Sequence, residues 1–311
     1  MTRPVLMTGA SGFVGRAVAA RLVAAGATVV SLGRSVPALH GVRHLDADIG
    51  DAIEARAVVD RLRPRAVLAL ASAPPPAADD IHETVTLGAA LALLAAAQTV
   101  EGCRFVGIGS AAEYGSAETD APLGEDALRL PASAYGRAKA QLMDMIAEAA
   151  SSGGDAVGLR LFAAIGPDMP THSLLGSVVR QLRAPDRTVV RTGALDGWRD
   201  YLPVAAVARL TVALALAPTR PPAWINVGSG RATALRELVA ATLRFSGRAV
   251  EFREAERPET ARGRCIVADV TRLKSLGHAV DPLPVADLAV LALGMAAGDD
   301  DHAGSEALRP S

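Results

Sequence analysis

The segment Val5-Leu-Met-Thr-Gly-Ala-Ser-Gly-Phe-Val-Gly15 decides the fold of this 311-residue chain. Its first three residues form a short apolar run typical of a buried strand, and the helical pattern Val14–Ala25 follows. Between them Gly9, Gly12 and Gly15 are spaced three residues apart. A glycine-rich turn between a strand and a helix lets backbone amides approach a pyrophosphate, whose charge the helix N-terminus favours. The segment therefore predicts a dinucleotide site, with a purely structural turn as the alternative.

Short apolar runs and helical patterns alternate through the first half of the chain, which is typical of βαβ units. We therefore predict an α/β fold with a doubly wound parallel sheet, a Rossmann domain. The predicted strands are 5–7, 28–32, 66–71, 104–108, 157–161, 224–227 and 265–268. The predicted helices are 14–25, 52–62, 85–99, 134–150, 173–182 and 204–216, and a loop is expected at 74–80.

The regular alternation loosens after the fifth of these strands, where prolines become frequent. We expect residues 1–164 with 203–228 to form the dinucleotide-binding Rossmann domain. Residues 165–202 with 229–297 are expected to form a smaller C-terminal substrate-binding lobe. The tail 298–311 is rich in Asp, Gly and Ser and is expected to be disordered.

Composition and charge restrict the class of protein. Half of the residues are hydrophobic and the net charge is −1, so neither nucleic acid nor an anionic membrane is expected as a partner. No signal-peptide pattern is found, and apolar runs such as Ala89–Ala97 fall short of the ~20 residues of a membrane span. Cys103 and Cys265 have no metal-ligand spacing and are interpreted as small buried hydrophobes. We expect a cytoplasmic protein with no metal site.

The end of the second predicted strand carries the choice between nicotinamide cofactors. A carboxylate there bonds the ribose hydroxyls, whereas an arginine accommodates a 2′-phosphate. The segment Val29–Ser35 has no acid but contains Arg34, which favours NADP(H) and leaves NAD(H) possible. The alternative is that Arg34 is only a solvated loop charge. Asp48, followed by Ile49, is placed to meet the adenine or to cap a helix beginning near Asp51.

A tyrosine and a lysine form the strongest chemical motif of the chain. Only two of the 32 basic residues are lysines, and Lys139 follows Tyr135 by four residues, on one face of a predicted helix. With three tyrosines, chance pairs of this spacing should number ~0.02. An ammonium ~4 Å from the phenol would favour phenolate by about 4 kcal/mol, or about three pKa units. The pair predicts a general acid that protonates an oxygen as hydride arrives, rather than an ordinary amphipathic pair.

Ser110 is expected to join this pair. It ends the predicted strand 104–109, at the carboxyl edge where doubly wound sheets bind ligands. Its hydroxyl can donate to a carbonyl oxygen and accept from Tyr135. A serine that caps a helix or turn is the alternative.

Together these motifs resemble the extended short-chain dehydrogenase/reductases, that is, the NAD-dependent epimerase/dehydratase family acting on nucleotide sugars. Within that family the chain is most similar to GDP-6-deoxy-4-keto-D-mannose reductases. The resemblance rests on Gly9-x-x-Gly12-x-x-Gly15, Ser110-Ala-Ala-Glu-Tyr-Gly115 and Tyr135-Gly-Arg-Ala-Lys139, and continues through 159–167, Arg199-Asp-Tyr201, 226–230 and Arg257-Pro258.

The resemblance implies roles for individual residues. Ser110, Tyr135 and Lys139 would be the catalytic triad. Cofactor contacts are expected from Gly9, Ser11, Gly12, Phe13, Val14, Gly15, Arg34, Asp48, Ile49 and Ala71, together with Tyr135 and Lys139. Substrate contacts are expected from Ser110, Ala111, Ala163, Arg199 and Arg257, with the two arginines on the diphosphate. The resemblance also implies a homodimer formed through the helices 85–99 and 134–150.

Departures from the family pattern refine the expected reaction. Dehydratases of the family carry Asp-Glu directly after the catalytic hydroxyl residue, where this chain has Ala111 and Ala112, so dehydration is not expected. Ala163 replaces the family's usual asparagine near the sugar. We expect NADPH-dependent reduction of the 4-keto group of a nucleotide-linked 4-keto-6-deoxysugar. The alternatives are an NAD-dependent nucleotide-sugar 4-epimerase and a non-catalytic cofactor-binding protein.

Overall fold

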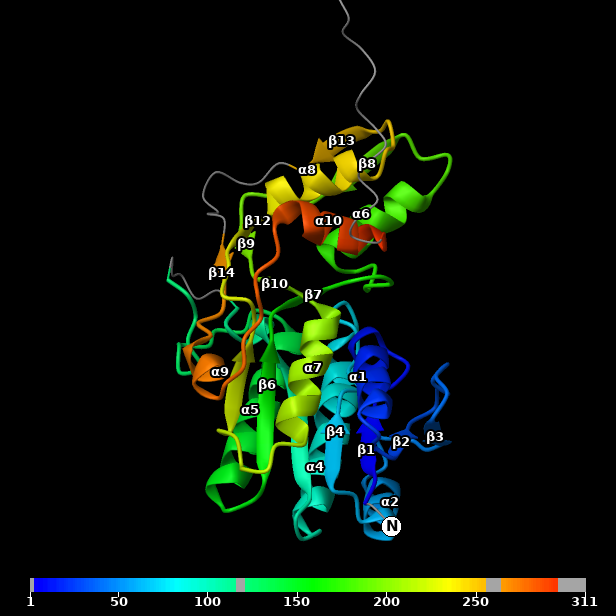
Figure 1. The fold of residues 1–311 in the computed structure, drawn as a ribbon, viewed down its shortest axis with the longest axis vertical. Helices are drawn as coiled ribbons and strands as arrows, with labels where there is room; N and C mark the ends of the chain where they lie inside the picture. Colours follow the sequence, from blue (N-terminus) through cyan, green and yellow to red (C-terminus); the bar gives the residue numbers. More distant parts are fainter. Residues whose placement is uncertain (1–2, 116–120, 256–263, 296–311) are drawn as a thin grey trace, which may run out of the picture.

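The computed structural model describes residues 3–115, 121–255 and 264–295, which form two parts stacked along the long axis of the molecule (Figure 1). The larger part contains a seven-stranded sheet in the order β3-β2-β1-β4-β5-β6-β11, with every pair parallel. These strands are β1 (Val5–Thr8), β2 (Val29–Leu32), β3 (Val42–Leu45), β4 (Ala66–Ala69), β5 (Arg104–Ser110), β6 (Ala156–Leu161) and β11 (Trp224–Val227).

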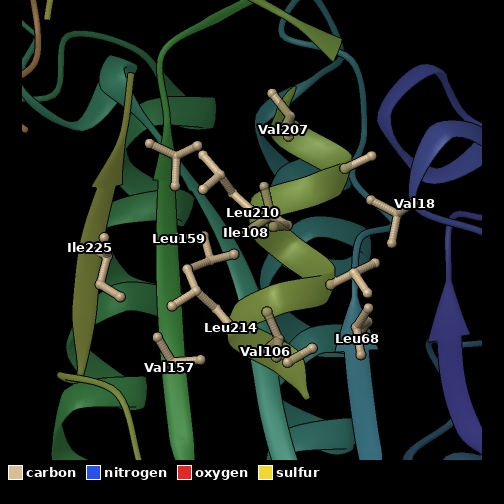
Figure 2. Close-up of a cluster of buried hydrophobic side chains, with 14 of the residues drawn as sticks. Val18, Leu68, Val106, Ile108, Val157, Leu159, Val207, Leu210, Leu214 and Ile225 are labelled. Carbon is tan, nitrogen blue, oxygen red and sulfur yellow. The ribbon is translucent and has the colours of Figure 1, made fainter. Parts of the chain in front are cut away.

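Helices cover both faces of this sheet. Neighbouring residues of a strand point to opposite faces, so Val5 and Met7 belong to one buried cluster and Leu6 to another. The first face is covered by α1 (Phe13–Ala24) and α7 (Val204–Ala215), the second by α2 (Ala52–Leu62), α4 (Ala89–Gln98) and α5 (Ala134–Ser151). Figure 2 shows the side chains of α7, including Leu210 and Leu214, against those of the strands. The predicted doubly wound parallel sheet is confirmed.

The strand order places the functional edge of the sheet. The chain reverses its direction of winding at β1, which lies between β2 and β4. At such a switch point the loops after neighbouring strands diverge and leave a crevice at their carboxyl ends, where ligands bind. The glycine-rich turn after β1, the segment after β4 and Ser110 at the end of β5 therefore meet at one edge.

The smaller part has its own hydrophobic cluster. It is built from α6 (Leu174–Arg183), α8 (Leu235–Phe245), α10 (Val285–Leu293) and the strand pair β8 (Val189–Thr192) and β13 (Glu251–Glu254). Short pairings between the parts are β7 (Ala163–Ile165) with β10 (Tyr201–Pro203), and β9 (Trp198–Arg199) with β12 (Thr233–Ala234) and β14 (Cys265–Ile266). β9, β12 and β14 fall in the predicted substrate-binding lobe, whereas β7 and β10 straddle its predicted boundaries, and the division into domains stays a prediction. The predicted disordered tail lies outside the described residues.

One predicted boundary is wrong. The helix expected at 85–99 begins at Asp79, within the expected loop 74–80, and runs through α3 (Asp79–Ile81), the π-helical η1 (His82–Gly88) and α4. Asp79 and Asp80, which suggested a loop, lie in its first turn, where acidic side chains complement the helix dipole. The stretch Asp79–Gln98 has a mean hydropathy of 1.3 and is long enough to cross a bilayer, but half of it is buried within the fold.

Candidate active site

A cavity of about 490 Å³ lies at the switch point of the sheet. It collects residues from the β1–α1 turn, the end of β2, the loop after β3 and the segment after β4. Its lining includes the predicted cofactor residues Gly9, Ser11, Gly12, Arg34, Asp48, Ile49 and Ala71. Ser31, Ser72, Thr84 and Val85 also line it and were not predicted. Phe13, Val14 and Gly15 are in the first turn of α1 and are not part of the lining.

The glycine-rich turn folds back on itself so closely that only glycine fits. Gly9 has φ +70°, and a Cβ there would lie 2.7 Å from the backbone nitrogen of Ala71. A Cβ on Gly15 would lie 1.8 Å from the carbonyl oxygen of Gly9. Gly12, the N-cap of α1, offers no side chain to the first N–H groups of the helix. A cradle of backbone amides at a helix N-terminus fits the pyrophosphate of a dinucleotide.

The two residues expected at the adenosine end are on this cavity. Arg34 is exposed after β2 and lines the cavity together with Asp48. Asp48 accepts a hydrogen bond from the Gly50 N–H (3.0 Å), whereas Asp51 caps α2 by accepting from the Ile53 N–H (2.8 Å). The alternative that Asp48 caps the helix is therefore wrong, because Asp51 performs that role.

The structure brings Ser110, Tyr135 and Lys139 together. Ser133 caps α5 by accepting from the Gly136 N–H (3.1 Å), which places Tyr135 in the first turn of a helix that packs against β5. Lys139 is 2% exposed, and its Nζ donates to the carbonyl oxygen of Ile108 (2.8 Å). The same Nζ lies 5.7 Å from the centroid of the Tyr135 ring. The Ser110 side chain lies close enough to the Tyr135 phenol to lower its pKa.

The pKa of Tyr135 differs from the expectation. Burial raises this pKa above the ordinary value of a phenol, and the interaction with Ser110 only partly opposes the rise. Burial lowers the pKa of Lys139 to about 8. The predicted net depression of the Tyr135 pKa is therefore wrong, because α5 lies on the sheet and the loss of water around the phenol outweighs the effects that favour the phenolate. A phenol with a raised pKa is protonated at neutral pH, which suits a general acid.

A second cavity, of about 400 Å³, adjoins Ser110. The predicted substrate residues Ala111, Ala163 and Arg199 line it with Ser110, and Ala112, Ser133, Phe162, Asp200 and Arg264 complete part of the wall. Arg199 donates to the carbonyl oxygen of Arg264 (2.8 Å). Asp200 accepts from the Ser229 and Gly230 N–H groups, so it serves the local fold. Arg257 lies outside the described residues.

Sequence reasoning missed a buried polar network beneath Ser110. Glu113 accepts from the Ser110 N–H (2.8 Å) and from Arg160 Nε (2.9 Å). Arg160 also donates through Nη1 to the Tyr114 hydroxyl (2.8 Å). Two signals could have revealed the network. Ser110 and Glu113 have the Ser-x-x-Glu spacing of a capping box, which the structure contains, and Arg160 interrupts an otherwise apolar strand.

Comparison with known proteins agrees with this geometry. Residues 5–228 match the model of the NAD dependent epimerase/dehydratase family. A relative, the dTDP-6-deoxy-L-talose 4-dehydrogenase (NAD(P)(+)) of Kitasatospora kifunensis, is 31% identical over 264 residues, which cover 82% of this chain and 83% of that protein. The chain belongs to the NAD-dependent epimerase/dehydratase family, and it is an oxidoreductase.

Solved structures share the fold. MoeE5 in complex with UDP-glucose and NAD superposes with a TM-score of 0.80 at 24% identity, covering 93% of this chain and 97% of that one. The UDP-glucose 4-epimerase of Thermus thermophilus in complex with NAD gives a TM-score of 0.79 at 24% identity, with the same coverage.

Proposed function

We propose that this protein reduces the 4-keto group of a nucleotide-linked 4-keto-6-deoxysugar with NADPH. The observation that carries the proposal is the meeting of Ser110, Tyr135 and Lys139 at the sheet edge that the glycine-rich cavity and the Arg199 cavity share. The relative from Kitasatospora kifunensis, named for a dTDP-6-deoxysugar and NAD(P)(+), supports both the substrate class and the cofactor class.

The residues of this chain divide the work of the reaction. Gly9, Gly12 and the N-terminus of α1 would hold the pyrophosphate of the cofactor, and Arg34 its 2′-phosphate. When bound, the reduced nicotinamide supplies the hydride for carbon 4. Tyr135 then gives its phenolic proton to the carbonyl oxygen, which the Ser110 hydroxyl orients by a hydrogen bond. The protonated Lys139 favours the phenolate that is left until it regains a proton from water.

The second cavity fits a deoxysugar linked to a diphosphate. Its wall includes the small side chains of Ala111, Ala112 and Ala163, which suit an apolar methyl group better than a hydroxyl. Ala111 and Ala112 also carry no group that could move a proton at a carbon beside the ketone. Arg199 provides a guanidinium for the diphosphate.

The direct test is an assay with NADPH and a panel of nucleotide-linked 4-keto-6-deoxysugars, with NMR identification of the product. We expect NADPH consumption matched by a 4-hydroxy sugar. Purified protein with stoichiometric bound NAD, and no net NADPH consumption, would instead indicate the 4-epimerase. Unchanged cellular function after loss of Tyr135 would indicate a non-catalytic cofactor-binding protein.

The variant Arg34→Ala tests the cofactor preference. Because a charge-assisted hydrogen bond contributes about 1.5–3 kcal/mol, KM for NADPH should rise at least about tenfold while KM for NADH changes little. The measurement is initial-rate kinetics with each cofactor. Arg61→Ala, which removes an exposed arginine at the end of α2, is the matched control and should leave both values unchanged. A wild-type enzyme that strongly prefers NADH would contradict the proposal.

We also propose that the protein is a cytoplasmic homodimer that pairs through η1, α4 and α5. These helices lie side by side on one face of the sheet, and Arg137 of α5 pairs with Asp79 of α3 at 3.2 Å. Neither nucleic acid nor a membrane is expected as a partner. Light scattering should give twice the 31.9 kDa mass of one chain. A monomeric mass at micromolar concentration would contradict this arrangement.

A further inference from the structure

Glu113 is a fully buried carboxylate to which the proposed reaction gives no task. It closes the short 3₁₀ turn η2 (Ala111–Glu113) that follows β5. One carboxylate oxygen accepts from the Ser110 N–H (2.8 Å), and the other accepts from Arg160 Nε on β6 (2.9 Å). The catalytic serine is therefore tied through its main chain to a buried ion pair.

The end of β5 is built around this carboxylate. A Cβ on Gly109 would lie 2.5 Å from Glu113 Oε1 and 2.9 Å from the sulfur of Met143, so glycine leaves the room that the carboxylate occupies. Arg160 is 1% exposed, and a guanidinium does not lose its proton in proteins. Burial raises the pKa of Glu113, and the Arg160 guanidinium opposes that rise. A neutral Glu113 would leave the cation unpaired in the core, which is strongly unfavourable, so the pair is ionised.

The charge of Glu113 affects the pKa of both Lys139 and Tyr135. It raises the pKa of Lys139, against the effect of burial, and it raises the pKa of Tyr135 in the same direction as burial. The other charged groups facing Glu113 are Arg160 from β6 and Arg129, whose Nη1 lies 3.8 Å from Oε2. Tyr114, on the far side of Arg160, contributes only a hydroxyl.

We propose that Glu113 is a positioning residue of this active site: its carboxylate fixes the Ser110 main chain and provides a buried negative charge that acts on Lys139. The proposal rests on the proposed function for the roles of the three residues. The effect of the Glu113 charge on Lys139 is a property of the folded chain, so it can be measured without substrate.

The chain suits a direct test because it contains only two lysines. In protein labelled with ¹³C-lysine, Lys139 and the exposed Lys274 give two separate signals, which Lys274→Arg assigns. Lys139 should titrate at about 8 in the wild type. In Glu113→Gln it should titrate at least about one pH unit lower, because an opposite charge has been removed. The Lys274 signal serves as the internal reference.

Tyr114→Phe is the matched control, since it removes a hydrogen bond from the same buried network and keeps the charge. It should leave the Lys139 titration unchanged. If Glu113→Gln does not fold, the double variant Glu113→Gln with Arg160→Gln removes both charges and leaves no unpaired guanidinium. The Lys139 titration should then still fall, but by less, because the lost Arg160 charge acts in the opposite direction. An unchanged titration in either folded variant, or an equal fall in Tyr114→Phe, would overturn the proposal.

Activity separates this inference from the proposed function. If the enzyme reduces 4-keto sugars, the loss of kcat/KM on the alkaline side should move to lower pH in Glu113→Gln by the same amount as the Lys139 signal. A shifted Lys139 signal in a protein without reductase activity would refute the proposed function alone. Reductase activity with an unshifted signal would refute the role of Glu113 alone.

Discussion

Replacing Tyr135 with phenylalanine is expected to lower kcat for carbonyl reduction at least about 100-fold, with little change in KM for NADPH. The ring remains between His82, whose centroid is 5.5 Å away, and Lys139, so the wall of the site is kept. Only the hydroxyl is lost, and with it the proton that the developing alkoxide needs. Because burial raises the pKa of Tyr135, the wild-type phenol is protonated across the neutral range.

The matched control for this variant is Tyr201→Phe. Tyr201 is one of only three tyrosines, it is buried on β10, and burial raises its pKa to about 12. Its side chain packs in the hydrophobic cluster of the smaller part, away from Lys139. Single-turnover measurements of NADPH oxidation on the same substrate should therefore show a large loss for Tyr135→Phe and nearly normal rates for Tyr201→Phe. Retention of more than a tenth of wild-type kcat by Tyr135→Phe would contradict its role as the acid.

What the sequence predicts well in this protein is local or follows from the rules of parallel sheets. The glycines at 9, 12 and 15 belong to one turn, and the pair 135 and 139 to one helical turn. Ser110 ends β5 and Arg34 follows the end of β2, so both lie at the carboxyl edge of a parallel sheet whose strand order is typical of the doubly wound class. Spacing along the chain is therefore enough to predict that these residues lie at one edge.

What the sequence does not predict depends on burial and on partners distant in the chain. The sign of the Tyr135 pKa shift follows from how closely α5 packs on β5, which no local pattern encodes. In the sequence, Glu113 looks like an ordinary acidic residue in a turn. Its ion pair with Arg160, 47 residues later, forms only because β5 pairs with β6. The helix start at Asp79 was missed because helix propensity alone does not separate a polar first turn from a loop.

Gly15→Ala is expected to abolish measurable dinucleotide binding and to destabilise the protein by about 3 kcal/mol. The added methyl carbon would lie 1.8 Å from the Gly9 carbonyl oxygen, 2.7 Å from its carbon and 3.1 Å from the Cα of Ala10, all of them backbone atoms that cannot rotate away. Overpacking of this kind costs about 1–3 kcal/mol or more. Relief requires α1 to move away from the turn, and a displacement of about 1 Å costs about 100-fold at a positioned site.

Thermal melts with and without NADPH, together with fluorescence titration of NADPH, measure the two effects separately. Gly193→Ala is the control, because this exposed loop glycine has no atom within 4 Å of its added Cβ and should keep wild-type stability and affinity. If Gly15→Ala is folded and still binds NADPH within about threefold of the wild type, the turn is a structural one and the pyrophosphate lies elsewhere. Gly9 and Arg34 line the same cavity, and the predicted preference for NADPH assumes that one cofactor contacts both. If the pyrophosphate does not bind at the glycine-rich turn, that preference loses its basis.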